Sequence, residues 1–173
     1  MPLPTEFDVN EIFIIITGII LTLIFVKILP KRFTYTTSII LFLHKISIAI
    51  AVDNVFAGPP LDLYDVMDTK EFESMDLVLY FFVYGPYTYI IIYIYDKWFY
   101  HKHLFQKFIY LVLVSLISIF FEFIAGYLEV YQFKGWKHYY SFPIYLIVYF
   151  TNFYLLEFLK NKERNLIPKM KVK

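Results

Sequence analysis

Long apolar runs alternate with short polar segments along the chain. Five such runs lie at residues 12–29, 34–52, 77–95, 108–130 and 141–159. Each is close to the roughly 20 residues that a helix needs to cross a hydrocarbon core of about 30 Å. The runs are apolar on all faces rather than along one stripe, which is typical of helices that lie in lipid. The pattern predicts an all-α, five-span transmembrane bundle that forms a single membrane domain over residues 1–173.

The composition agrees with a membrane location. Of the 173 residues, 60% are hydrophobic and 23% are aromatic, whereas soluble domains contain about 45–50% apolar residues. A chain of this length lacks the interior volume to bury the excess, so lipid is the expected surrounding. The net charge of +1 gives no indication of nucleic acid as a partner. Because the chain contains no cysteine, disulfides and cysteine-based metal sites are excluded.

The charges between the runs predict an orientation, because the cytoplasmic loops of membrane proteins are enriched in Lys and Arg. The segments that follow the first, third and fifth runs are basic. The segment before the first run and the long segment after the second run are acidic, and the segment after the fourth run is only weakly basic. This alternation predicts that the N-terminus lies outside the cell and the C-terminus in the cytoplasm.

Four ionisable residues inside the runs form the candidate polar site. Lys45 and His44 lie within the second run, Asp53 lies near its outer end, and Glu122 lies within the fourth run. Charged groups are costly in hydrocarbon, so they indicate function by default. If the two runs are neighbours, Lys45 or His44 can reach Glu122. Such a pair either fixes how helices pack or forms a polar site or proton relay, and the sequence leaves both open.

The acidic segment after the second run has a pattern of its own. Helical spacing would place Asp62, Asp65 and Asp68 on one face of residues 61–68, with apolar residues opposite. The pattern predicts a short amphipathic helix on the outer membrane surface. Together with Asp76, these carboxylates form an outer acidic loop. No calcium-loop spacing is present, and the sequence predicts neither a metal nor a cofactor.

Aromatic residues gather at the predicted ends of the runs, where their rings are expected at the level of the lipid headgroups. Trp136 and Tyr140, beside the start of the fifth run, are the expected interface anchors. The remaining members of this group are Tyr80, Tyr84, Trp98, Tyr100, Tyr127, Tyr131 and Tyr139.

Several short motifs follow one another from about residue 60 to residue 160. They are Asp76 at the start of the third run, Tyr84-x-Pro86 within it, Phe121-Glu122-Phe123 in the fourth run, Gly135-Trp136, and Tyr140-Ser141-Phe142 at the start of the fifth run. In this order they resemble an uncharacterised family of small five-span membrane proteins of spore-forming Gram-positive bacteria. The resemblance implies a five-span fold and a location in the bacterial plasma membrane, without an assigned activity.

Two classes of function fit these observations. The leading interpretation is a non-enzymatic multi-pass membrane protein, either part of an envelope complex or a binder of a small ligand. Its partners would be the lipid bilayer and either a second copy or another membrane protein. The alternative is a proton-coupled transporter or a membrane enzyme that uses Glu122. Convergence of Glu122, His44 and Asp53 on one cavity would favour the alternative, whereas a packed interior would favour a structural role.

The predicted topology can be tested with single cysteines, since the chain has none of its own. Cells are labelled with a maleimide that does not cross the membrane. We expect only the positions in outer segments, residues 8, 65 and 134, to react. Reaction of a cytoplasmic position would contradict the orientation or the number of spans. The substituted residues are Asp8, Lys31, Asp65, Lys102, Lys134 and Lys171.

Overall fold

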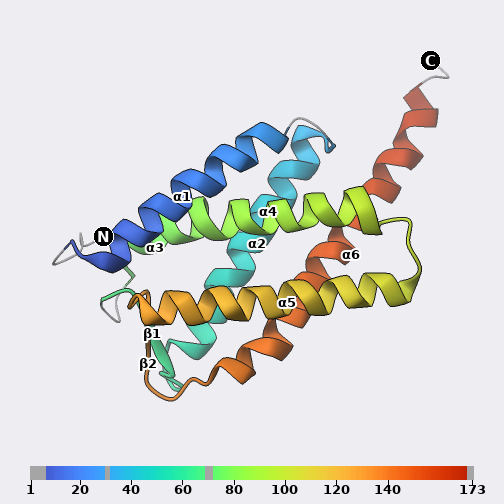
Figure 1. The fold of residues 1–173 in the computed structure, drawn as a ribbon. Coiled ribbons are helices and arrows are strands. Elements are labelled where there is room, and N and C mark those ends of the chain that lie inside the picture. The colour runs from blue at the N-terminus through green and yellow to red at the C-terminus, as the bar shows by residue number, and fades with distance from the viewer. Residues whose placement is uncertain (1–6, 30–31, 69–71, 171–173) are drawn as a thin grey trace.

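The protein is a helical bundle in the computed structural model, which describes residues 7–29, 32–68 and 72–170. Within these ranges, α-helices, two π-helical stretches and two short strands follow one another (Figure 1). They are α1 (Val9–Ile28), α2 (Tyr35–Phe56), β1 (Tyr64–Val66), α3 (Ser74–Val78), η2 (Leu79–Tyr84), α4 (Gly85–Ile94), η3 (Tyr95–Phe99), α5 (Leu104–Tyr127), β2 (Tyr131–Phe133) and α6 (His138–Met170).

Five helices of the described chain are long and apolar enough to cross a membrane. The third of them is continuous from α3 to η3, and the fifth is the N-terminal part of α6. Their bounds are Val9–Ile28, Tyr35–Phe56, Ser74–Phe99, Leu104–Tyr127 and His138–Asn165. The predicted all-α, five-span fold is confirmed, and most of the helices extend a few residues beyond the apolar runs.

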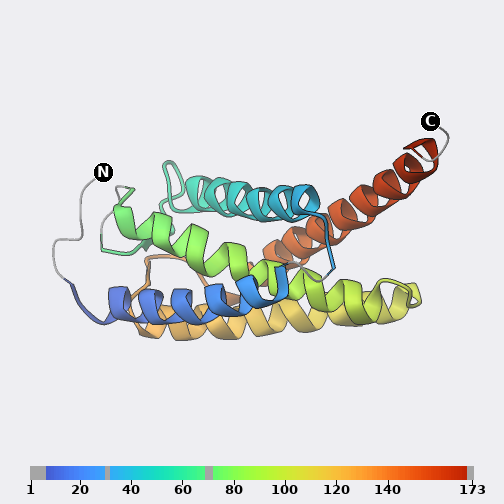
Figure 2. The same cartoon turned by 90° about the horizontal axis from the view of Figure 1, so that it is seen from above.

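The helices do not surround one central axis evenly. Helix α1 packs on η2 and α4, α2 packs on α4 and α6, and α5 packs mainly on α6. Helices α1 and α5 lie on one side of the bundle and α2 lies on the other (Figures 1 and 2). As a result, η2 and α4, which belong to the third span, lie behind α1 and α5.

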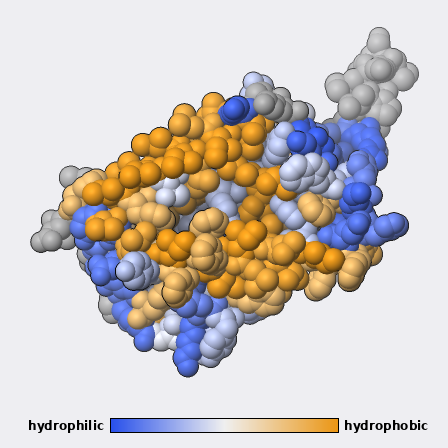
Figure 3. All heavy atoms as spheres, in the orientation of Figure 1, coloured by the Kyte–Doolittle hydropathy of each residue, from blue (hydrophilic) through white to orange (hydrophobic). Residues whose placement is uncertain are grey.

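The distribution of side chains is the reverse of that in a soluble protein. On α1, Ile19, Leu23 and Val26 are 56%, 66% and 60% exposed, whereas Ser115 of α5 and Asn152 of α6 are fully buried. Figure 3 shows hydrophobic residues over the middle of one face and hydrophilic residues at its two ends. Apolar residues outside and polar residues inside fit a bundle surrounded by lipid.

Strands β1 and β2 close one end of the bundle as an antiparallel pair, with Tyr64 opposite Phe133 and Val66 opposite Tyr131. The prediction of a short amphipathic helix over residues 61–68 is therefore wrong. The local pattern was overridden by pairing with a segment almost 70 residues further along the chain.

Local backbone geometry also excludes that helix. Asp62 and Met67 have positive φ angles of 44° and 59°, which are outside the right-handed helical region. The carbonyl oxygen of Leu63 accepts hydrogen bonds from the backbone N–H groups of Lys134, Gly135 and Trp136 at 2.9, 3.0 and 3.1 Å. These long-range bonds satisfy the backbone that a helix would otherwise have satisfied locally.

Ion pairs hold the opposite end of the bundle together. Asp96 of η3 accepts hydrogen bonds from Arg32 Nε at 2.6 Å and from Lys160 Nζ at 2.5 Å, although its side chain is only 1% exposed. Lys107 of α5 pairs with Glu157 of α6 at 2.5 Å. These contacts join the third, fourth and fifth spans with one another and with the segment between α1 and α2.

Gly85 allows close packing between the second and third spans. A Cβ atom at this position would overlap with the ring of Phe42. We expect Gly85→Ala to lower the free energy of unfolding by about 1–3 kcal/mol, the usual cost of overpacking. Gly135→Ala is the matched control, because its Cβ would meet Leu63 at an ordinary 3.5 Å. Thermal unfolding in detergent measures both, and equal midpoints would contradict the prediction.

Candidate functional site

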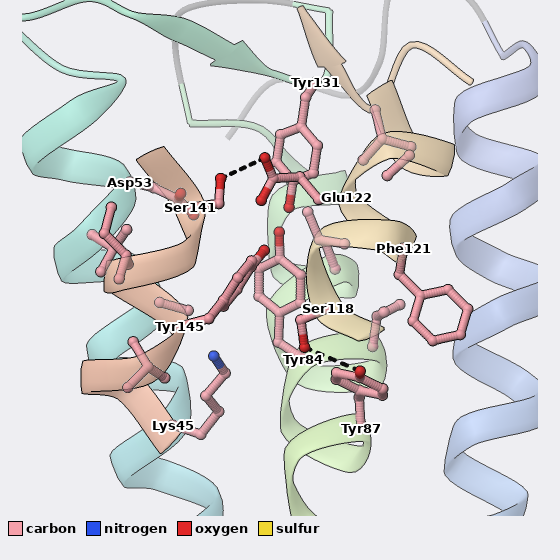
Figure 4. A pocket seen from close by; sticks show the side chains of 18 of the residues that line it. Lys45, Asp53, Tyr84, Tyr87, Ser118, Phe121, Glu122, Tyr131, Ser141 and Tyr145 are labelled. Atoms are coloured by element: carbon pink, nitrogen blue, oxygen red, sulfur yellow. Dashed lines mark hydrogen bonds between the residues drawn. The ribbon is translucent and has the colours of Figure 1, made fainter. Parts of the chain in front are cut away.

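A cavity of about 260 Å³ lies inside the bundle, toward the end that β1 and β2 close. All five spans and both strands contribute to its wall (Figure 4). The wall is mainly apolar and aromatic, and its polar side chains gather where the cavity meets the strands. The volume is slightly below the roughly 300–1,000 Å³ that small-molecule sites occupy.

Lys45 of α2 points into this cavity (Figure 4). Its side chain is buried, and the whole residue is only 7% exposed. Within the described part of the chain, its ammonium group has no hydrogen-bond or ion-pair partner. It lies 5.8 Å and 6.0 Å from the ring centroids of Tyr84 and Tyr149, at the outer limit of cation–π attraction. The three N–H donors of Lys45 are therefore unused.

Asp53 lies two helical turns after Lys45 on the same helix, and its side chain also lines the cavity. Its two carboxylate oxygens are already occupied. Oδ1 accepts a hydrogen bond from the Tyr64 hydroxyl at 2.6 Å, and Oδ2 accepts one from the Tyr80 hydroxyl at 2.7 Å. Burial, and then the neighbouring charge of Asp53, raises the pKa of Tyr64, which keeps that hydroxyl protonated as a donor.

Glu122 of α5 lies at the strand end of the cavity, where its Oε1 atom accepts several hydrogen bonds. Ser141 Oγ donates at 2.6 Å and Trp136 Nε1 at 3.3 Å. Nδ1 of His138 lies 3.3 Å from the same oxygen. Trp136 Nε1 also donates to Ser141 Oγ at 2.9 Å. The carboxylate is thus held by donors from the start of α6 and the loop before it.

The structure brings together three of the four predicted polar residues. Lys45, Asp53 and Glu122 all line one cavity, but the direct contact between Lys45 and Glu122 that the sequence allows is not made. His44 is not part of the cavity wall, and its Nδ1 atom lies 3.3 Å from Oδ1 of Asn152 in α6. Neighbouring residues of α2 point in different directions, so only one of these two faces the cavity.

The residues of the predicted outer acidic loop do not gather at one point. Asp62 and Asp65 each accept a hydrogen bond from Lys134 Nζ at 2.7 Å. Asp68 accepts one from Asn10 Nδ2 at 2.8 Å. Asp76 accepts one from the backbone N–H of Glu73 at 2.7 Å, in the cap that begins α3. Across the described ranges, no three His, Asp or Glu residues are arranged to hold a metal ion.

The two expected interface anchors occupy different positions. Trp136 lies in the cavity wall and donates to Glu122, which makes it part of the polar site. Tyr140 is 41% exposed and contacts the Trp136 ring edge-on, with a centroid distance of 5.7 Å.

Sequence reasoning missed the tyrosine hydroxyls of the cavity. Figure 4 shows the hydroxyls of Tyr84, Tyr131 and Tyr145 turned toward one another beside Glu122. Tyr84 and Tyr131 have no hydrogen-bond partner among the described residues. A usable signal was the spacing of Tyr80, Tyr84 and Tyr87, which places three tyrosines on one face of a helix.

A second group of hydroxyls lies deeper in the cavity and is internally satisfied. Ser118 Oγ lies 2.6 Å from the Tyr149 hydroxyl and 3.1 Å from the Tyr87 hydroxyl, and it donates to the carbonyl oxygen of Val114 at 2.9 Å. The cavity therefore contains three carboxylate oxygens that already accept hydrogen bonds, a cluster of hydroxyls that satisfy one another, and unused donors on Lys45 and two tyrosines. Its chemistry suits a guest that presents hydrogen-bond acceptors.

The chain matches no protein-family model, and no curated protein or solved structure matches it at a significant level. The function is therefore inferred from the geometry of the cavity.

Proposed function

We propose that this multi-pass membrane protein binds a small molecule inside the bilayer, in the cavity lined by Lys45, Asp53 and Glu122. The observation behind the proposal is the buried ammonium group of Lys45, which faces this cavity without a partner in the described chain. An unpaired charge costs several kcal/mol in a low-dielectric interior. A purely structural lysine would be expected to have a carboxylate partner.

The surrounding wall supports a binding role over a packing role. Small-molecule sites are mostly apolar, with a few polar groups that fix the orientation of the ligand. This cavity has that composition, with aromatic rings on its sides and polar groups concentrated at one end. Neither Asp53 nor Glu122 neutralises Lys45 by direct contact, because both carboxylates are held by other donors.

The proposed setting is a bacterial plasma membrane, with the cavity in the outer half of the bilayer. The alternation of basic and acidic segments supports this orientation. The resemblance to small five-span proteins of Gram-positive bacteria supports the membrane in question.

Trp136 makes binding measurable, because it lies in the cavity wall while the other tryptophan, Trp98, is 56% exposed at the far end of its span. In a Trp98→Phe background in lipid nanodiscs, the uncharged dye N-phenyl-1-naphthylamine should show a saturable component of energy transfer from Trp136. We expect Ala49→Phe, which fills the cavity, to weaken this component at least about tenfold, a change of about 1.4 kcal/mol.

Ala51→Phe is the matched control, because Ala51 is exposed on the same helix. It should leave the saturable component unchanged. Circular dichroism and gel filtration establish that each variant is folded, and Ala49→Leu provides a milder obstruction. The proposal is contradicted if no saturable transfer occurs, or if folded Ala49→Phe binds the dye as well as Ala51→Phe does.

A proton-coupled carrier is the second candidate, and one observation favours it. His138 lies within 3.3 Å of Glu122 Oε1, and its own side chain is 38% exposed. This histidine could transfer protons between the surface and the buried carboxylate. An enzyme would need further catalytic groups around Glu122, and the donors that surround its Oε1 do not form such a set.

Coupling to protons would make ligand binding depend on pH through Glu122. A carrier predicts that the affinity for N-phenyl-1-naphthylamine changes with pH and that Glu122→Gln removes the change. If the protein only binds a ligand, the affinity for the dye should stay constant with pH in the unchanged protein and in Glu122→Gln. Glu129→Gln is the control, because Glu129 is an exposed carboxylate just beyond α5.

A further inference from the structure

The cavity opens sideways toward the lipid. Its wall includes Phe13, Thr17 and Leu21 of α1 and Phe121 and Ala125 of α5. These two helices each pack on other elements and make few contacts with each other. Figure 3 shows a hollow between the two hydrophobic ridges that α1 and α5 form, with less hydrophobic residues at its base.

The base of this hollow is the recessed third span. Tyr84 and Tyr87 of this span line the cavity. Phe121 stands at the edge and is 49% exposed. A molecule dissolved in the bilayer therefore has a route to Lys45. It first passes the apolar side chains at the entrance and then reaches the tyrosines.

The unused donors of the cavity, Lys45 above all, select the head of such a molecule. Lys45 has three unused donors, and the hydroxyls of Tyr84 and Tyr131 have no partner among the described residues. Both carboxylate oxygens of Asp53 and the Oε1 atom of Glu122 already accept hydrogen bonds from tyrosine, serine and tryptophan donors. An anionic acceptor would supply the partner that the ammonium group of Lys45 lacks.

We propose that the ligand is a bilayer-dissolved anionic amphiphile with a single chain, such as a fatty carboxylate. Its acidic head binds Lys45, and its chain leaves the cavity between α1 and α5. This inference rests on the proposed binding function and specifies its ligand class and route. The charge of Lys45 requires an anionic head, and the apolar opening requires a hydrocarbon chain.

Competition in nanodiscs separates the head-group claim from the binding claim. N-phenyl-1-naphthylamine reports cavity occupancy without a charge, and oleate, oleyl alcohol and oleylamine are compared as competitors at equal mole fractions in the bilayer. We expect oleate to displace the dye at least about tenfold more effectively than the other two, as one charge-assisted hydrogen bond allows. Acetate in the aqueous phase should not displace it.

Variants of Lys45 identify the group responsible. Lys45→Gln should remove the preference for oleate while oleyl alcohol competes as before, and Lys45→Arg should retain it. Lys27→Gln is the control, because Lys27 is exposed at the end of α1. Equal competition by oleate, oleyl alcohol and oleylamine would overturn the head-group claim while the binding function stands. Competition by acetate would overturn a lipid source, and absence of dye binding would overturn both proposals.

A photoreactive fatty acid tests the route. Palmitate with a diazirine in mid-chain should label peptides of α1 and α5 that face the hollow, and an excess of oleate should suppress this labelling. Labelling confined to the outward faces of α2, or labelling that oleate does not suppress, would overturn the placement of the chain between α1 and α5.

Discussion

Hydrocarbon around the bundle supplies no hydrogen-bond partner, so each polar side chain inside a span depends on the protein itself. Most of them here have found one. Asp53 is held by two tyrosines, Glu122 by a serine and a tryptophan, and Ser118 by its own backbone and Tyr149. Lys45 is a charged side chain that has not, and it gives the interior its chemistry. Its ammonium group is buried, faces open space, and lacks a partner within the described residues.

The same constraint explains why the two ends of the bundle differ. At one end, long-range backbone hydrogen bonds between the segments around β1 and β2 replace regular helix. At the other end, Asp96 joins Arg32 and Lys160, and Lys107 joins Glu157. Contacts between distant segments thus stabilise both ends of the bundle, and the cavity lies between these ends, nearer to the strands. Because α1 and α5 are separated, the cavity faces the lipid between them. Its unused hydrogen-bond donors favour a ligand that presents acceptors.

The spans could be predicted from the sequence because hydrophobic length is a local property that the bilayer thickness sets. Lys45, Asp53 and Glu122 could be singled out for a related reason, since an ionisable residue within an apolar run is visible without knowledge of its neighbours. Their convergence could not be predicted, because it depends on which spans pack together and on helix rotation. His44 shows this limit, since it precedes Lys45 in the chain and faces Asn152 instead of the cavity.

Features that depend on distant segments were missed. The pairing of Tyr64 with Phe133 joins two loops that are far apart in sequence, and it turned an expected surface helix into a strand. From the sequence, Tyr84 and Tyr131 were grouped with the aromatic residues at the ends of the apolar runs, whose rings are expected at the level of the lipid headgroups. Only the fold places their hydroxyls in the interior.

A double-mutant cycle between Lys45 and Glu122 tests most directly whether the ammonium group is free. The free energy of unfolding in detergent is measured for Lys45→Met, for Glu122→Gln and for the double variant. The structure predicts that the two effects add to within about 0.5 kcal/mol, as for residues without contact. A coupling energy well above about 1 kcal/mol would reveal a direct pair. In that case Lys45 would already be satisfied, and the cavity would have no charge to offer a ligand.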